Sequence, residues 1–165
     1  PQHNFIDLVL ECKPTQVTLV PDAIGALTSN AGWDTIKHQS YLTEVIQEFQ
    51  RNGIRTSIFV DADEKMIEGA KATGTERIEL YTESFAHEYG LGNKNGIKPF
   101  IKAAIKANEL NIGINAGHDL SMDNIKFFKE NIPNLLEVSI GHALISESLY
   151  LGLENVVNMY LQKLK

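Results

Sequence analysis

Several residue types and patterns are scarce in this sequence, and each scarcity excludes a class of protein. The single cysteine, Cys12, rules out an internal disulfide framework and is typical of a protein kept in the reducing cytoplasm. No uninterrupted apolar stretch approaches the roughly 20 residues that a membrane-spanning helix needs. Basic residues number 15 against 21 acidic ones, and the net charge of −6 argues against general binding to nucleic acid or anionic membranes. Any anionic ligand must therefore be held by local backbone and a few side chains.

Signature motifs of several enzyme classes are missing too. The sequence has no Walker loop, no Rossmann glycine triplet and no nucleophile elbow. Asp61 and Asp63 resemble a short metal-binding pair, but no His or Cys accompanies them at ligand spacing, and Asp63 fits better as the N-cap of a helix. Three further histidines also lack the spacing of a zinc site: His3, His38 and His87. We therefore predict no metal site.

The composition that remains is that of an ordinary globular protein. Of the 165 residues, 43% are hydrophobic and 22% are charged, and no low-complexity tract interrupts them. A chain of this length can bury a substantial core, so we expect a single domain over residues 1–165.

Short apolar runs alternate with segments of helical periodicity along the whole chain. Runs bounded by turn residues predict five strands, at residues 16–20, 55–60 and 77–81 and in the stretches that begin at Asn111 and Glu137. Helical spacing predicts helices between them, an opening helix within residues 3–12 and a helical tail from about Ser146, with its apolar residues on one face. Residues 23–39 and 82–95 are weakly patterned, and we expect two long loops there.

This alternation predicts a parallel sheet with right-handed helical crossovers. A five-stranded open sheet is one solution, and an eight-stranded (β/α) barrel is the other. Five units in 165 residues extrapolate to about 264 for eight, close to the ~250 residues of a typical barrel. The opening helix has no start signal before it and resembles the remainder of an upstream unit. We therefore predict an α/β TIM barrel to which this chain contributes about five of the eight β/α units, with the amino-terminal units missing.

Two Gly-His pairs mark the expected site, because each closes one of the last two strands. Gly117-His118 and Gly141-His142 lie where barrel strands end, which is where such enzymes bind phosphate. Backbone amides at a helix start can hold an anion, and imidazole can act there as an acid or base. His118 could instead be a loop residue that caps the next helix, and His142 could be a helix-start residue with a solvated ring.

Other polar residues also lie at or near the predicted strand ends. Glu79 lies within a strand and is either a functional carboxylate inside the barrel or an outward partner in a salt bridge. Thr28, in the first predicted loop, offers a hydroxyl to a polar ligand, although turn chemistry explains it equally well. Asp22 and Asn115 complete the candidates near these ends.

Six motifs occur in the same order and spacing as in one known family. They are residues 20–22 (Val-Pro-Asp), 27–28 (Leu-Thr), 57–63 (Ser-Ile-Phe-Val-Asp-Ala-Asp), 77–80 (Arg-Ile-Glu-Leu), 114–118 (Ile-Asn-Ala-Gly-His) and 139–145 (Ser-Ile-Gly-His-Ala-Leu-Ile). In these motifs the chain resembles the pyridoxine 5'-phosphate synthase family of vitamin B6 biosynthesis, and the resemblance covers essentially all of it.

The resemblance implies a reaction and a set of residue roles. The family condenses 1-deoxy-D-xylulose 5-phosphate with 3-amino-2-oxopropyl phosphate, releases phosphate and water, uses no metal or organic cofactor, and forms homo-octamers. By motif position, His118 matches the proton-donor histidine and Glu79 the glutamate near the reacting centre. Asp119, Gly141 and His142 match the site of the amino-ketone phosphate, and Thr28 matches a contact to the pentulose phosphate.

The chain departs from the family at informative positions. The residue after the catalytic histidine is usually Gly but is Asp119 here, and we predict that only its backbone serves the phosphate while its carboxylate turns away. A His-Thr-Gly sequence usual in the family is replaced by residues 81–83 (Tyr-Thr-Glu). The family's first three strands, with its general base and most phosphate-binding arginines, have no counterpart here, so we expect these 165 residues alone to be inactive. Two alternatives stay open: another phosphate-binding barrel enzyme of the aldolase or isomerase type, and a non-catalytic fragment.

Overall fold

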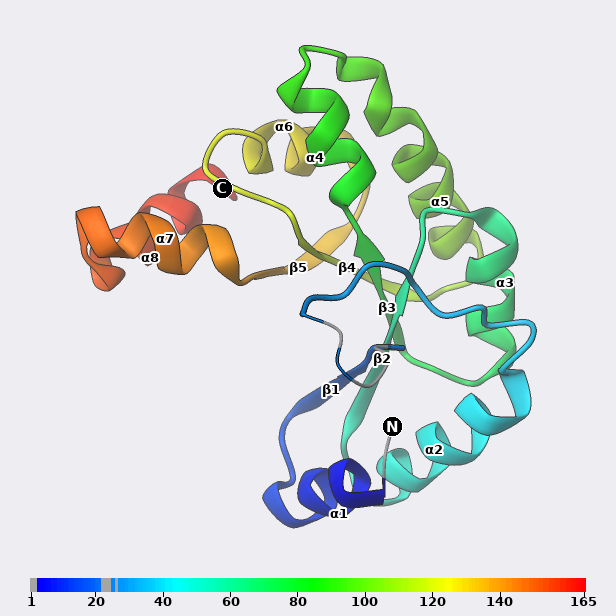
Figure 1. Ribbon diagram of the computed structural model, residues 1–165. Coiled ribbons are helices and arrows are strands. Elements are labelled where there is room, and N and C mark those ends of the chain that lie inside the picture. The colour runs from blue at the N-terminus through cyan, green and yellow to red at the C-terminus, as the bar shows by residue number, and fades with distance from the viewer. Residues whose placement is uncertain (1–2, 22–24, 26) are drawn as a thin grey trace.

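A computed structural model describes residues 3–21, 25 and 27–165 of the chain. Five parallel strands form one sheet in the order of the sequence (Figure 1). They are β1 (Gln16–Leu19), β2 (Arg55–Val60), β3 (Arg77–Tyr81), β4 (Gly113–His118) and β5 (Leu135–Ile140). The predicted strands are confirmed, and the candidate Asp22 lies outside the described residues.

Helices lie between successive strands, before β1 and after β5 (Figure 1). They are α1 (His3–Cys12), α2 (Gln39–Arg51), α3 (Glu64–Ala72), α4 (Glu83–Gly90), the 3-10 turn η1 (Lys94–Ile97), α5 (Lys98–Glu109), α6 (Ile125–Asn131), α7 (His142–Leu151) and α8 (Leu153–Lys163). Because side chains alternate along a strand, Ile58, Ile78 and Ile114 share one face, and all three are fully buried in the apolar core.

The sheet is curled, as side-chain contacts between its two edge strands show. In a flat sheet, β1 and β5 would lie roughly 19 Å apart, four strand spacings of about 4.8 Å. Here the Gln16 side chain of β1 comes within 3.5 Å of the Glu137 carboxylate of β5. Arg55 of β2 reaches the same carboxylate at 2.9 Å, and Arg77 of β3 reaches it at 2.7 Å. The predicted barrel is therefore confirmed as a partial (β/α)8 barrel, and the open sheet is excluded.

The second predicted loop is wrong in part, because residues 83–90 form helix α4. Its aromatic residues Phe85 and Tyr89 are one helical turn apart and pack against each other with ring centroids 5.6 Å apart. Phe85 is buried, and its ring lies 5.0 Å from that of Phe128 on α6 and 6.0 Å from that of Phe100 on α5. Packing of these rings stabilises a helix whose polar sequence alone does not indicate one. In the first predicted loop, residues 27–38 contain neither a helix nor a strand.

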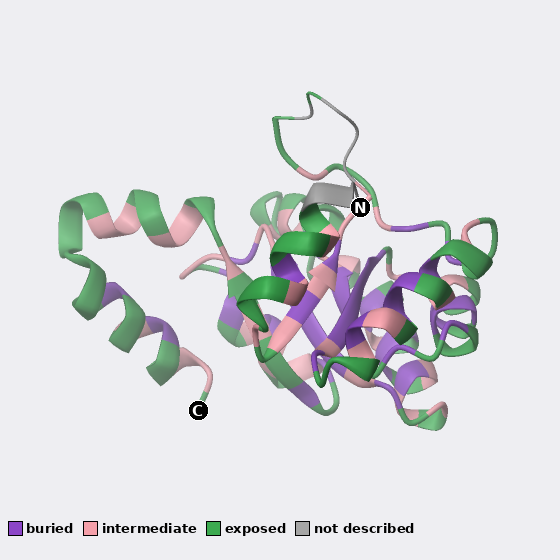
Figure 2. Cartoon of the chain, turned by 90° about the horizontal axis from the view of Figure 1, so that it is seen from below, coloured by how far each residue is buried: buried purple, intermediate pink, exposed green. Residues whose placement is uncertain are grey.

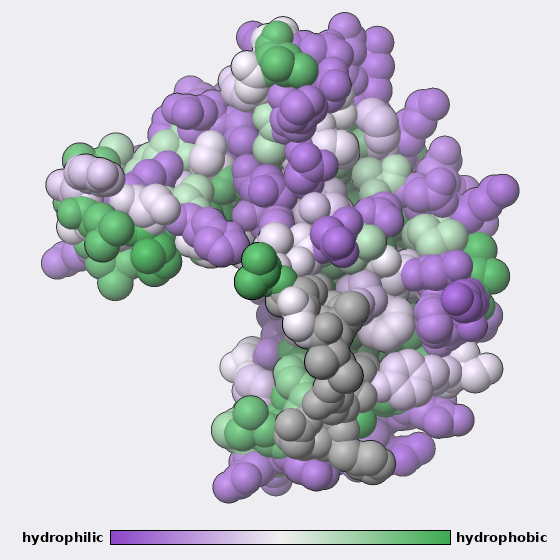
Figure 3. Space-filling view, in the orientation of Figure 1, coloured by the Kyte–Doolittle hydropathy of each residue, from purple (hydrophilic) through white to green (hydrophobic). Residues whose placement is uncertain are grey.

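The predicted single helical tail is also wrong, because it consists of two helices separated by Gly152. Gly152 has φ 81°, a conformation that glycine adopts without strain, and it ends α7 and begins α8. The two helices extend away from the sheet (Figures 1 and 2). Their apolar residues do not form one buried face, since only Val156 and Tyr160 are buried. Leu149, Leu153 and other large apolar side chains of α7 and α8 are exposed, and Figure 3 shows a green area over these helices.

No helix in the described part of the chain is both long enough and apolar enough to cross a membrane.

Candidate active site

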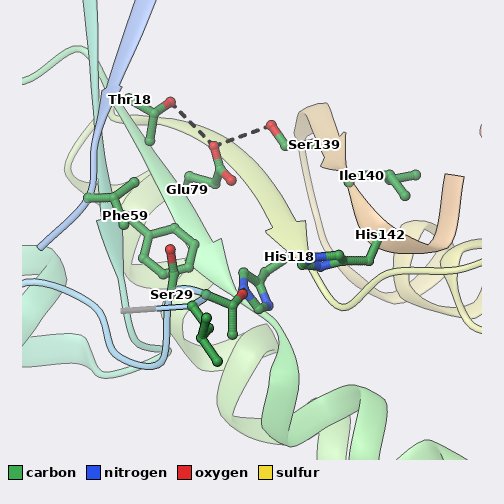
Figure 4. A pocket seen from close by; sticks show the side chains of 12 residues that line it. Thr18, Ser29, Phe59, Glu79, His118, Ser139, Ile140 and His142 are labelled. Carbon is green, nitrogen blue, oxygen red and sulfur yellow. Dashed lines mark hydrogen bonds between the residues drawn. The ribbon is translucent and has the colours of Figure 1, made fainter. Parts of the chain in front are cut away.

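A cavity of about 500 Å³ opens at the carboxyl ends of the strands (Figure 4). Residues from all five strands, the first loop and the start of α7 line it: Thr18, Val20, Leu27, Thr28, Ser29, Phe59, Glu79, His118, Ser139, Ile140, Gly141 and His142. Both Gly-His pairs therefore lie at one rim, as the sequence predicts, and Glu79 and Thr28 face the same space. A volume of this size suits a small-molecule ligand.

Glu79 points into the barrel and is only 7% exposed, so of the two orientations left open by the sequence the inward one is found. Its Oε2 atom accepts hydrogen bonds from Thr18 on β1 at 3.3 Å and from Ser139 on β5 at 3.4 Å (Figure 4). Burial raises the pKa of the Glu79 carboxyl, because a charge loses hydration there, while the two hydroxyl donors and the nearby His118 partly offset that effect. A carboxyl group of this kind can hold or release a proton closer to neutral pH than an exposed glutamate.

Gly117 leaves the space that the Glu79 side chain occupies. A Cβ atom at position 117 would lie 2.6 Å from Glu79 Oε1 and 2.7 Å from the carbonyl oxygen of Ser139. Such distances are far below van der Waals contact, so a side chain cannot be accommodated there without movement. The glycine of this first Gly-His pair is thus explained by the carboxylate beside it.

His118 is held from both ring nitrogens. Its Nε2 lies 2.8 Å from Thr28 Oγ1, and its Nδ1 lies 2.5 Å from Asp119 Oδ2. The residue has φ 90°, which is uncommon for residues other than glycine. The N-cap of the following helix α6 is Asn124, so the alternative in which His118 caps that helix is excluded.

Two aromatic side chains beside His118 were not predicted from the sequence as site residues. The Tyr81 ring meets the imidazole edge to face at a centroid distance of 5.1 Å, and the Phe59 ring lies 6.3 Å away. Burial raises the pKa of the Tyr81 hydroxyl, and nearby carboxylates, Asp119 first among them, raise it further. Tyr81 and Phe59 are residues of β3 and β2 that face the barrel interior, and the alternation of these strands is the sequence signal for them.

The sequence does not predict Thr18 and Ser139 as site residues either, for a different reason. Each is an ordinary small polar residue within a strand, and its contact with Glu79 depends on the curl of the sheet. No local sequence pattern encodes that curl.

The second Gly-His pair forms the start of α7. Gly141 occupies the N-cap position, the helix begins at His142, and no side chain caps it. The first turn of a helix presents amide groups without intrahelical acceptors, which favours an anion. His142 and Gly141 both line the cavity, so an anion at this helix start would lie in the same space as His118 and Glu79.

The first loop is anchored to the sheet, which places Thr28 over the cavity. The Trp33 indole donates to the carbonyl of Leu19 at 3.1 Å, and the Trp33 amide donates to the carbonyl of Phe59 at 2.9 Å. The Gly32 amide donates to the Asp61 carboxylate at 3.3 Å. Asp61 therefore serves to hold this loop against the end of β2.

The remaining candidates have structural partners. Asp63 is the N-cap of α3, as predicted, and accepts hydrogen bonds from the amides of Lys65 at 2.8 Å and Met66 at 3.1 Å. Asn115 lies deeper in the barrel, where its side chain bonds to Arg77 and Glu137. Within the described part of the chain, no group of three or more His, Cys, Asp or Glu residues is placed to hold a metal ion.

The partial barrel with this rim cavity defines a (β/α)-barrel enzyme that acts on a small polar ligand. The model of the family described as pyridoxal phosphate biosynthesis protein PdxJ matches residues 1–165, and the chain belongs to this family.

Proteins named pyridoxine 5'-phosphate synthase are similar to this chain over its full length. The protein of Flavobacterium johnsoniae is 82% identical over 165 residues, which are 100% of this chain and 70% of that protein. The protein of Christiangramia forsetii is 66% identical with the same coverage, and that of Cytophaga hutchinsonii is 56% identical, with 100% of this chain and 69% of that protein covered. The chain thus spans about 70% of the length of these relatives.

Proposed function

We propose that this chain is part of a pyridoxine 5'-phosphate synthase of vitamin B6 biosynthesis. In this reaction 1-deoxy-D-xylulose 5-phosphate and 3-amino-2-oxopropyl phosphate condense to pyridoxine 5'-phosphate, phosphate and water. One observation carries the proposal: Glu79, His118 and the Gly141-His142 pair line a single cavity in a chain that is 82% identical to a protein of that name.

In the proposed mechanism, His118 donates a proton and Glu79 acts near the reacting centre. The release of phosphate and water requires groups that give protons to departing oxygens, and imidazole is suited to this at neutral pH. Glu79 lies across the same cavity, within the electrostatic influence of His118. Its buried carboxylate is suited to stabilise positive charge that develops during ring closure.

The two substrate phosphates require separate binding groups. We assign the amino-ketone phosphate to the start of α7, at Gly141 and His142, together with the backbone of Asp119. Unpaired amides at the helix start support this assignment. We assign the pentulose phosphate to Thr28, whose hydroxyl already lies 2.8 Å from the His118 ring. With a net charge of −6, the chain depends on such local groups to hold dianionic ligands.

The proposal extends to the state of the whole enzyme. We expect a homo-octamer in the cytoplasm that works without metal or organic cofactor. The exposed apolar side chains of α7 and α8 support self-association, because large apolar patches commonly mark interfaces.

An aldolase or isomerase on the same barrel is the competing enzyme class. An aldolase of the Schiff-base type would need a lysine in the cavity. The described residues that line the cavity include no lysine, which favours the synthase.

The test is product formation by the complete enzyme that contains this chain, with His118→Gln as the decisive variant. Loss of a general acid should lower kcat about 10²–10⁴-fold. His87→Gln is the matched control, since His87 lies on α4 and does not line the cavity. Wild-type enzyme that forms no pyridoxine 5'-phosphate from the two substrates would refute the proposed function, and full activity of His118→Gln would refute the proposed role of His118.

A further inference from the structure

The carboxylate of Asp119 points at the His118 ring. Asp119 Oδ2 lies 2.5 Å from His118 Nδ1, while Nε2, on the opposite side of the ring, faces Thr28 and the cavity. We propose that Asp119 is a positioning residue for His118, which fixes Nδ1 as the protonated nitrogen and leaves Nε2 to exchange protons with substrate. This inference rests on the proposed role of His118 as proton donor.

The backbone of Asp119 is fixed from two directions, which holds the carboxylate in place. The Asp119 amide donates to Thr82 Oγ1 at 3.4 Å, and Asn124 Nδ2 donates to the Asp119 carbonyl oxygen at 3.2 Å. Thr82 in turn donates from its hydroxyl to the carbonyl oxygen of Gly117 at 2.8 Å. The turn after β4 is therefore tied to the end of β3 and to the start of α6.

The ring of His118 is restrained as well. Tyr81 meets it edge to face, and only 18% of the His118 side chain is exposed. With Asp119 on Nδ1 and Thr28 on Nε2, a 180° rotation of the imidazole would break both hydrogen bonds. A restrained ring keeps Nε2 in one position, which is what proton transfer in a defined geometry requires.

The hydrogen bond has a chemical consequence for the proton that is transferred. A carboxylate at Nδ1 accepts the Nδ1 proton, so in the neutral ring Nε2 carries the lone pair and can accept from the Thr28 hydroxyl. When the ring gains a proton at Nε2, the same carboxylate stabilises the imidazolium. Transfer of that proton to a departing oxygen returns the neutral ring, with Nδ1 still protonated. The proton count balances, and Asp119 itself never needs to be protonated.

The same contact answers the question raised by a negative residue beside a phosphate site. The Asp119 carboxylate is engaged by His118 and is one-third exposed, so its charge is paired with the ring when the imidazole is protonated. Asp119 therefore provides a carboxylate that binds His118 Nδ1, which a glycine at position 119 could not provide.

The experiment compares Asp119→Asn with Asp123→Asn in the complete enzyme. Both variants remove one carboxylate and keep the side-chain size, but Asp123 is exposed and outside the cavity. For Asp119→Asn we expect kcat to fall about 10–100-fold, the range found when carboxylates that orient metal-bound histidines are replaced, while KM for both substrates changes less than about twofold. Asp123→Asn should behave as wild type.

Two further measurements separate positioning from other roles. In ¹⁵N-histidine-labelled enzyme, the neutral His118 ring should carry its proton on Nδ1 in the wild type and shift toward Nε2 in Asp119→Asn, because the asparagine amide can donate to Nδ1. In a double-mutant cycle, Asp119→Asn should cause no further loss in the His118→Gln background, since its effect passes through the ring.

The outcomes distinguish this inference from the proposed function. If Asp119→Asn lowers KM for a phosphate substrate and leaves kcat and the tautomer unchanged, the carboxylate only repels phosphate and the inference is overturned while the proposed function stands. An additive loss in the double mutant would also overturn it. If His118→Gln is fully active, the role of His118 fails first, and the inference fails with it.

Discussion

At the scale of single residues, Glu79 is a buried carboxyl group that accepts side-chain hydrogen bonds from two described residues, Thr18 and Ser139. Its neighbours on β1 and β5 reach it because the strands curl, and Gly117 gives it room. The site thus depends on small side chains, Thr18, Ser139 and Gly117, that surround one carboxylate.

Replacing Glu79 by Gln should separate activity from stability. Burial raises the pKa of Glu79 above the ordinary value of 4.5, so the folded state binds this proton more tightly than the unfolded state. Ionisation of Glu79 therefore costs stability as pH rises from about 4.5 through the raised pKa. Glu79→Gln cannot ionise, and its thermal midpoint relative to wild type should rise over that pH range while kcat falls about 10²-fold.

Thermal unfolding of the complete enzyme from pH 4 to 8 measures this difference. Glu44→Gln, an exposed position on α2, is the control and should show no comparable trend. A Glu79→Gln variant that becomes less stable than wild type as pH rises would contradict the prediction.

Gly117→Ala should damage both the fold and the site. The added Cβ would lie 2.6 Å from Glu79 Oε1 and 2.7 Å from a backbone oxygen, and the backbone cannot move as freely as a side chain. We expect a loss of about 1–3 kcal/mol in the free energy of unfolding, measured by denaturant titration, together with reduced kcat. Gly90→Ala, whose Cβ would meet no atom within 4 Å, should leave both quantities nearly unchanged.

At the scale of elements, helix α4 owes its existence to aromatic packing. Phe85 contacts rings on α5 and α6, so α4 is fixed to two neighbours at once. The 3-10 turn that follows α4 adds Lys94, which lies 5.4 Å from the centre of the Phe127 ring.

Phe85→Ala should therefore destabilise the protein strongly. Removal of a fully buried phenyl ring costs about 3–5 kcal/mol, because the cavity that remains is only partly filled by relaxation. Denaturant titration of the complete enzyme measures this loss. Leu91→Ala, one residue beyond α4 and 71% exposed, is the control and should change the free energy by less than about 0.5 kcal/mol. A similar small effect for Phe85→Ala would show that α4 does not depend on this cluster.

Several features of the fold can be predicted from the sequence alone. The strands and the barrel follow from alternation and spacing along the chain, whereas these leave the direction of Glu79 open, and only the structure shows that it points inward. The positions of His118 and His142 at one rim followed from the rule that parallel strands end at the same edge.

Other features could not be predicted, because they depend on tertiary contacts. The sequence of helix α4 predicts a loop because its only large apolar residues are Phe85 and Tyr89, and these pack against helices distant in the sequence. The sequence does not predict the break at Gly152, because apolar residues keep a helical spacing on both sides of it. The helical backbone nevertheless ends there and a new helix begins. The pairing of Asp119 with His118 is set by the turn geometry after β4, which no spacing rule describes.

At the scale of the whole molecule, the chain forms an arc of a barrel, and we propose that it supplies one part of an active site. The proposed reaction also needs a general base and cationic phosphate ligands, which the family resemblance assigns to the three strands without a counterpart here. We therefore expect the isolated 165-residue chain to form no pyridoxine 5'-phosphate, whereas the complete enzyme does.

A chromatographic assay with both substrates tests this expectation directly. The His118→Gln complete enzyme sets the detection limit for a disabled site. Product formation by the isolated chain above that limit would contradict the assignment of the missing catalytic groups.

The polar contacts deep in the barrel have a consequence for how the remaining strands join. Glu137 on the fifth strand binds arginines of the second and third, and Gln16 of the first strand approaches it as well. The radius of the arc is thus set by bonds within these five strands. Strands that complete the cylinder meet two edges whose spacing is already determined, so this arc acts as a template for closure.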